Sequence, residues 1–123
     1  MSAVRSFEEL RCWQKARELV GLVYVACNTT QLSKDFGTKD QIRRAALSAM
    51  NNIAEGFGKD SNREFLRFLD IAQASCMEVK SITYVLQDLN YLPLREVKTI
   101  REKTDEVKGL TRALIKHLKS TLP

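Results

Sequence analysis

The sequence predicts an all-α protein, folded as an up-down-up-down antiparallel four-helix bundle. Apolar residues recur at helical spacing, and no strand-like alternation persists. Only two of the 123 residues are proline, Pro93 and Pro123, and both fall outside the periodic stretches. Short segments separate four long helical stretches, and short connections favour antiparallel neighbours. A chain of this length is ordinarily one domain, here 1–123.

The first two helices are expected at about 7–28 and 39–55. The first opens on Ser6 and Glu9, which match the S-x-x-E pattern of a capping box. Its apolar stripe consists of Leu10, Trp13, Ala16, Val20, Val23, Tyr24 and Cys27. Thr38 is the predicted cap of the second helix, which should end at Gly56-Phe57-Gly58, where glycine can adopt the left-handed conformation.

The third and fourth helices are expected at about 62–90 and 94–119. Ser61 and Glu64 form another capping box at the start of the third helix. Tyr91-Leu92-Pro93 supplies the turn, and the fourth helix follows with apolar residues in near-heptad order. Capping patterns and apolar periodicity therefore agree on the same four elements.

Two helices carry a second set of apolar residues beside the first. These residues are Cys12, Leu19, Leu22 and Ala26 on the first helix, and Leu66, Met77 and Tyr84 on the third. A helix of a monomeric bundle needs one apolar face, so the pattern predicts an interface between copies of the chain. The alternative is that both helices are more deeply buried within one protomer.

The net charge of +5 is concentrated near the end of the chain. Residues 95–123 carry eight basic and four acidic side chains, a net of +4. The fourth helix presents a basic ridge, interrupted by Asp105, that consists of Lys98, Arg101, Lys108, Arg112 and Lys119. Arg43 and Arg44 add a second positive spot. These seven residues are candidate contacts for a nucleic-acid backbone. No aromatic residue is interleaved with the ridge for base stacking, and the residues alone slightly favour a solvated charged face.

The second helix also carries a polar set on the side opposite Ile42 and Ile53. This set consists of Arg44, Ser48, Asn51, Asn52 and Glu55. Small alanines nearby permit close approach of another backbone. The pattern favours a hydrogen-bonded contact with a neighbouring helix or subunit over a ligand site.

The sequence predicts no enzyme, cofactor or metal site. Cys12, Cys27 and Cys76 are widely spaced and should be buried, reduced thiols. Arg112 and His117 do resemble the R-x4–6-H motif of HEPN-type ribonucleases, which act without a metal. Those enzymes usually carry a polar residue where this chain has Ala113, so a surface Arg and His is the favoured interpretation. No stretch is apolar enough for a membrane span or a signal peptide, which predicts a cytoplasmic protein.

Several segments together resemble one family, the four-helix-bundle proteins encoded in intervening sequences of bacterial large-subunit ribosomal RNA genes. The most specific are Gln41-Ile42-Arg43-Arg44-Ala45-Ala46 and Asn52-Ile53-Ala54-Glu55-Gly56. Phe7-x-x-Leu10-x-x-Trp13 and Phe65-x-x-Phe68-Leu69-x-Ile71-Ala72 extend the likeness along the chain. The resemblance implies a ring-like homopentamer, related to accessory proteins of diversity-generating retroelements that look like nucleic-acid binders.

The leading functional hypothesis is therefore a non-enzymatic, self-associating bundle that binds RNA or DNA through the basic ridge. A protein scaffold that binds no nucleic acid is the second hypothesis. A metal-independent ribonuclease that uses Arg112 and His117 is the third.

Overall fold

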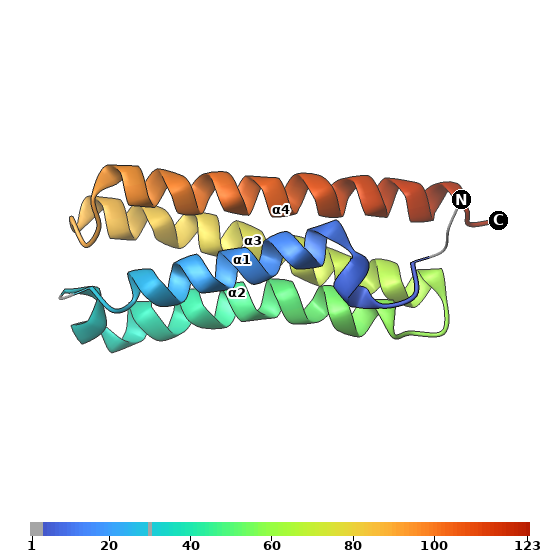
Figure 1. Ribbon diagram of the computed structural model, residues 1–123, viewed down its shortest axis with the longest axis horizontal. Helices are drawn as coiled ribbons and strands as arrows, with labels where there is room; N and C mark the ends of the chain where they lie inside the picture. The colour runs from blue at the N-terminus through green and yellow to red at the C-terminus, as the bar shows by residue number, and fades with distance from the viewer. Residues whose placement is uncertain (1–3, 30) are drawn as a thin grey trace.

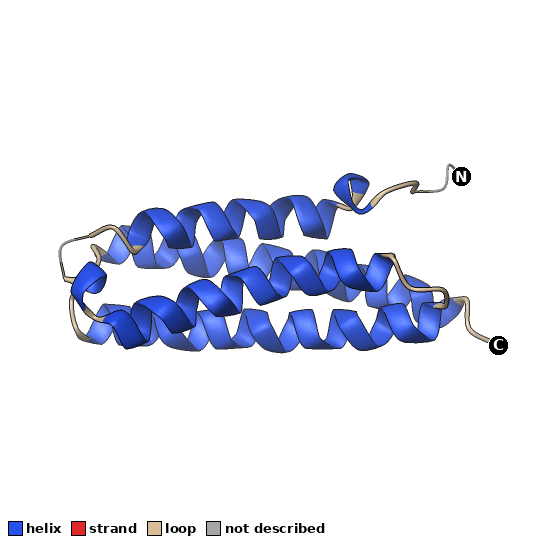
Figure 2. Cartoon of the chain, turned by 90° about the horizontal axis from the view of Figure 1, so that it is seen from below, coloured by secondary structure: helices blue, strands red, loops and turns tan. Residues whose placement is uncertain are grey.

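The computed structural model describes residues 4–29 and 31–123, and it confirms an all-α fold of four helices packed as a bundle. Its elements are η1 (Phe7–Glu9), α1 (Arg11–Ala26), η2 (Leu32–Lys34), α2 (Phe36–Phe57), α3 (Asn62–Asp88) and α4 (Leu94–Ser120). Only helices and connecting loops occur in these residues (Figure 2). None of the described helices combines the length and apolar character that a membrane crossing requires.

Consecutive long helices run in opposite directions, and the start of α1 and the end of α4 lie at the same end of the bundle (Figure 1). Helix α1 packs against α2 and α4, and α3 packs against the same two helices. As a result α1 and α3 are diagonal to each other, as are α2 and α4. The α2–α3 pair has the most extensive contact. This arrangement decides which helix faces remain exposed.

The start of the chain differs from the expected long first helix. Ser6 precedes the short 3-10 helix η1, and Leu10, with a ψ of 124°, separates η1 from α1. The Glu9 carboxylate accepts hydrogen bonds from the Arg5 backbone N–H at 3.2 Å and the Ser6 hydroxyl at 3.4 Å. The expected Ser6–Glu9 pair therefore forms, but it stabilises η1 and does not cap the α-helix.

The cap of α2 is Asp35, so the prediction of Thr38 was wrong. The Thr38 backbone N–H donates to Asp35 Oδ1 at 3.1 Å, and the Thr38 hydroxyl donates to Asp35 Oδ2 at 2.9 Å. Tyr91, in the α3–α4 connection, donates its hydroxyl to the same Oδ2 atom at 2.9 Å. Asp35 thus joins the two connections at this end of the bundle. By contrast, the predicted Ser61 cap of α3 is confirmed, because Ser61 Oγ accepts from the Glu64 N–H at 3.2 Å.

The hydrogen bonds that Asp35 accepts from Thr38 and Tyr91, here called the Asp35 clamp, predict that the free energy of unfolding depends on pH. Hydrogen bonds from the Thr38 backbone, the Thr38 hydroxyl and Tyr91 lower the pKa of Asp35, and the bond to Asp35 raises the pKa of Tyr91. The Asp35 contribution is complete above its unfolded pKa of about 3.9 and is lost as the pH falls through the lower folded pKa. The Tyr91 contribution is complete below about pH 10 and is lost as the pH rises through the higher folded value.

Asp35→Asn should therefore flatten the acid side of the stability profile, measured by urea unfolding between about pH 2 and pH 7. Tyr91→Phe, which removes one of the three hydrogen bonds, is the control and should give an intermediate profile. If the free energy of unfolding fell equally steeply toward low pH in the wild type and in Asp35→Asn, the role of the Asp35 clamp would be contradicted.

The buried face of α1 combines residues from both predicted stripes. Cys12, Leu19 and Ala26 are 3%, 0% and 7% exposed, whereas Tyr24 of the expected core stripe is 39% exposed. The reason is that α1 packs against α2 on one side and α4 on the other, so its buried face is centred between the two stripes. The interface prediction for Cys12, Leu19 and Ala26 is corrected: these residues belong to the protomer's own core.

The described cysteines are all free and buried, as predicted. Burial raises the pKa of Cys76 to about 12 and also raises the pKa values of Cys12 and Cys27. The thiols therefore remain protonated and unreactive near neutral pH.

Helix α2 ends at Phe57 with Gly58 as its C-cap, so the predicted stop at Gly56-Phe57-Gly58 is confirmed in position. The expected left-handed conformation is wrong, because none of the described glycines has a positive φ. Gly56 lies where α2 meets Phe65 and Phe68 of α3.

Candidate nucleic-acid and subunit interfaces

The basic ridge of α4 contains two kinds of side chain: some are exposed and form no ion pair in the described structure, and the others contact α3. Lys98, Arg112 and Lys119 are exposed, and none has an ion-pair partner among the residues that the structure describes. Arg101 and Lys108 are half-buried and contact α3. The ridge thus follows the edge of α4 that faces α3.

Arg101 is held in place by three residues of α3. Its Nε donates to Thr83 Oγ1 at 2.9 Å, and its Nη2 donates to Gln87 Oε1 at 2.5 Å. Its guanidinium carbon lies 3.7 Å from the centroid of the Tyr84 ring. Such a stacked arrangement suits the planar guanidinium group. Arg101 is therefore held in one orientation by α3.

Two more contacts join the ridge to α3. The Lys108 ammonium lies 2.7 Å from Met77 Sδ. Lys80 pairs with Asp105 at 3.0 Å, so the acidic residue that interrupts the ridge is neutralised by a lysine of the neighbouring helix. Met77 and Tyr84, predicted as interface residues, thus lie beside the basic ridge.

The two halves of α4 differ in charge compensation. In the first half, Lys103 pairs with Glu18 at 2.8 Å and Glu106 at 2.9 Å, and the hydrogen bond to Glu18 is the main cause of its raised pKa. No acidic residue occurs in 107–123, which carries Lys108, Arg112, Lys116 and Lys119. None of these four forms an ion pair within the described part of the chain. The uncompensated positive charge therefore lies on the second half of α4.

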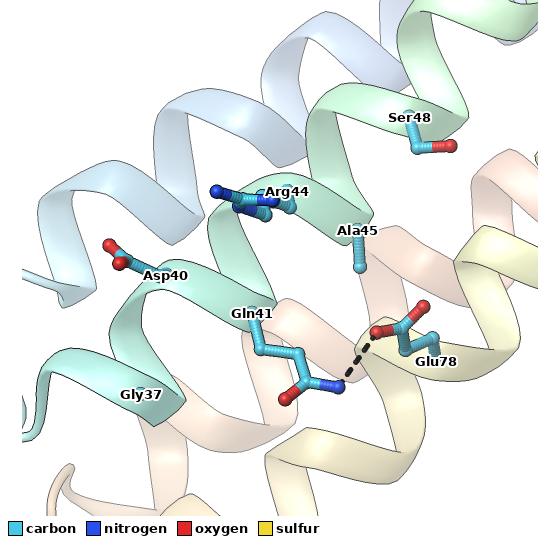
Figure 3. Close-up of a pocket in the computed structure, with 7 residues that line it drawn as sticks. All are labelled: Gly37, Asp40, Gln41, Arg44, Ala45, Ser48 and Glu78. Atoms are coloured by element: carbon cyan, nitrogen blue, oxygen red, sulfur yellow. Dashed lines mark hydrogen bonds between the residues drawn. The ribbon is translucent and has the colours of Figure 1, made fainter.

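Arg43 and Arg44 do not form one positive spot. Arg43 faces α1, where it pairs with Asp40 at 2.6 Å and lies 5.5 Å from the Tyr24 ring centroid. The bond to Asp40 raises its pKa. Arg44 is exposed and has no ion pair in the described structure. It lines a shallow groove between α2 and α3 and points away from Glu78 (Figure 3).

The polar network of α2 connects it with α3 of the same protomer. Ser75 Oγ donates to Ser48 Oγ at 2.8 Å, and Asn52 Nδ2 donates to the Ser48 carbonyl at 2.8 Å and to its hydroxyl at 3.0 Å. Gln41 Nε2 donates across the groove to Glu78 Oε2 at 3.3 Å (Figure 3).

The other predicted members of this network, Arg44, Asn51 and Glu55, are exposed and make no hydrogen bond or ion pair through their side chains with any residue that the structure describes. Sequence reasoning missed Ser75, although a serine within an apolar helical stripe is a usable signal for a buried hydrogen bond.

Exposed apolar side chains lie on the outer faces of α1 and α3. Tyr24 and Val25 of α1, here called the α1 patch, are 39% and 71% exposed. Val85 and the C-cap residue Leu89, here called the α3 patch, are 40% and 50% exposed, and Ile71, which is 45% exposed, lies about 20 Å away along the helix. The predicted Leu22 and Leu66 are half-buried and pack against the protomer's core. Sequence reasoning placed Tyr24 in the core and missed Val25 and the α3 patch, because the exposed faces of α1 and α3 depend on how both helices pack against α2 and α4.

Arg112 and His117 lie on different sides of α4. Five residues on an α-helix correspond to a rotation of about 140°. His117 lines a groove with Leu114, Leu118 and Phe57 at the end of the bundle. No hydrogen bond between the two side chains occurs in the described structure, and no group of three His, Cys, Asp or Glu residues there could hold a metal.

The fold and these surfaces define a small four-helix bundle with one basic helix edge and exposed apolar side chains on two diagonal helices. The sequence model of the 23S rRNA-intervening sequence protein family matches residues 8–113, so the chain belongs to that family. The resemblance inferred from its motifs is thereby confirmed.

A solved structure shows the same fold. It is a protein with unknown function from the S23 ribosomal protein family of Bacteroides thetaiotaomicron VPI-5482. The two share 24% sequence identity and a TM-score of 0.78, over 85% of this chain and 98% of that chain. No curated protein matches the sequence.

Proposed function

We propose that this protein is a non-enzymatic, self-associating bundle that binds RNA through the second half of α4. The observation that carries the proposal is the acid-free segment 107–123, whose four basic side chains have no ion-pair partner in the described residues. A phosphate backbone supplies the missing negative charge, and its binding by lysine and arginine releases condensed cations. The affinity should therefore depend on salt and little on sequence.

Replacing Arg112, Lys116 and Lys119 with glutamine should weaken RNA binding at low salt by about tenfold or more. The slope of log affinity against log salt should become shallower by about 2, because each lost single-strand phosphate contact contributes about 0.7. All three side chains are exposed, so the fold should be preserved. Filter binding across a salt series measures both quantities.

The matched control replaces Arg11, Lys34 and Arg95 with glutamine. These side chains are also exposed, and none forms an ion pair with any other residue of the described chain. The control has the same change in net charge but should keep the wild-type slope. Equal losses in both variants, or no binding by the wild type at low salt, would rule out the RNA proposal and favour a scaffold.

Self-association is proposed to occur through the α1 patch of one copy and the α3 patch of the next. The two patches differ in composition and lie on diagonal helices, so joining them gives a head-to-tail contact, which closes into a ring when the rotation permits. Val25 lies in the last turn of α1 and Val85 in the last turn of α3. The C-terminal ends of these two helices lie at the same end of the bundle (Figure 1), which allows neighbouring copies to meet side by side. The number five comes from the family resemblance and not from the protomer's geometry.

Val25→Asp should dissociate the oligomer at concentrations where the wild type is assembled, because it places a charge in an apolar contact. Val25 is 71% exposed in the protomer, so the variant should still fold. Leu94→Asp, at a position that is 48% exposed and outside both patches, is the control. Sedimentation velocity measures the assembly. A folded wild-type protomer that stays single at micromolar concentration would end this part of the proposal.

A further inference from the structure

We infer that the surface where α3 meets the basic ridge of α4 binds single-stranded nucleic acid, with the ring of Tyr84 as a platform on which a base stacks. This inference rests on the proposed function and specifies which form of nucleic acid the basic ridge accepts. The ridge contains no aromatic residue along α4 itself. The fold supplies one from α3, because Tyr84 lies against Arg101 near the N-terminal end of the ridge.

Tyr84 has the exposure that a stacking platform needs. Its side chain is 50% exposed, although Arg101 lies 3.7 Å from its ring centroid. Thr83 and Gln87 fix the Arg101 guanidinium by hydrogen bonds at 2.9 and 2.5 Å, which stabilises this arrangement. The guanidinium lies over the ring, so a base can stack on the outer face of the guanidinium or on the ring surface that Arg101 leaves uncovered.

Positive side chains flank the platform on both sides along α4. Lys98 lies three residues before Arg101, on the exposed edge. Lys108 lies seven residues after it, about 10 Å along the helix axis, and Arg112 follows one turn later. A strand whose backbone follows these cations could place a base on Tyr84. Cations that track a backbone beside an exposed aromatic ring are typical of single-strand binding sites.

The platform distinguishes single strands from duplexes. In a duplex the bases are paired and stacked on each other, so their faces are not available to a protein ring. The free cations of α4 can contact the phosphates of either form. Loss of the Tyr84 ring should therefore affect single strands selectively.

The test measures binding of an oligouridylate of about twenty nucleotides and of an RNA duplex of similar length, at the same low salt concentration. Tyr84→Ala should weaken binding of the single strand about tenfold and change duplex binding less than about twofold. Tyr84→Trp should retain single-strand binding, whereas Tyr84→Leu, which keeps an apolar surface without a ring, should not. Phe36→Ala is the control, since Phe36 is 68% exposed with Lys39 above its ring at 4.5 Å and lies on α2, diagonal to α4.

The possible results distinguish failure of the Tyr84 platform from failure of the proposed RNA binding by α4. If the wild type binds neither RNA, both fail. If it binds both forms and Tyr84→Ala changes neither affinity, the ridge binds RNA but Tyr84 is not a platform, and the inference is overturned. It is also overturned if Tyr84→Ala dissociates the oligomer in sedimentation, because Tyr84 then belongs to a subunit interface.

Discussion

Leu19→Ala should lower the free energy of unfolding by about 3 to 5 kcal/mol, the largest effect expected from a single truncation in α1. Leu19 is 0% exposed, so alanine would lose the transfer energy of the removed atoms and leave a cavity that neighbouring helices fill incompletely. Urea unfolding at two protein concentrations measures the loss and separates protomer stability from assembly.

The control for Leu19 is Val25→Ala on the outer face of the same helix. Val25 is 71% exposed, and its truncation should change protomer stability by less than about 0.5 kcal/mol. If Leu19→Ala altered the oligomeric state and left unfolding almost unchanged, Leu19 would belong to a subunit interface after all, as its sequence pattern first indicated.

Gly56→Ala should destabilise the protein by about 2 to 3 kcal/mol, although alanine is the better helix former. A Cβ atom at Gly56 would lie 2.7 Å from Phe68 Cβ and 2.9 Å from Phe65 Cδ1. It would also lie 3.3 Å from the Phe65 carbonyl oxygen. Phe68 Cβ and the carbonyl oxygen cannot move without the backbone, so α2 and α3 would have to separate where they now pack. Thermal and urea unfolding measure the loss.

Gly109→Ala is the matched control for Gly56, and its effect should have the opposite sign. Gly109 lies within α4, and nothing lies within 4 Å of its Cβ position. Alanine there should stabilise the protein by about 0.5 to 1 kcal/mol through helix propensity and reduced freedom of the unfolded chain. Destabilisation of similar size in both variants would mean that the α2–α3 contact does not explain the requirement at Gly56.

These glycines show where sequence reasoning succeeds and where it does not. A glycine near an expected helix end suggested a left-handed stop, yet Gly56 is needed because another helix passes close to it. A sequence shows which residue lacks a side chain, but not which backbone approaches it. The Ser61 cap was predicted correctly because its partner, Glu64, lies three residues away and the interaction is local.

Some features of the candidate surfaces are likewise visible in the sequence, whereas others depend on how the helices pack. The excess of basic residues after position 94 and the spacing of the ridge were visible in the sequence. The engagement of Arg101 by Tyr84 and the neutralisation of Asp105 by Lys80 were not, because each joins residues far apart in the chain. The division of Arg43 from Arg44 also depends on neighbours, since α1 lies on one side of α2 and α3 on the other.

The sequence by itself determined that the chain forms four helices, roughly where they lie and to which family it belongs, since periodicity, caps and motifs are local. Tertiary structure decided which side of α1 is buried, why Gly56 must be glycine and that Tyr84 meets the basic ridge. These features depend on how helices distant in sequence approach one another. A helix in isolation presents every face to solvent, and only its packed neighbours determine which side chains are removed from water.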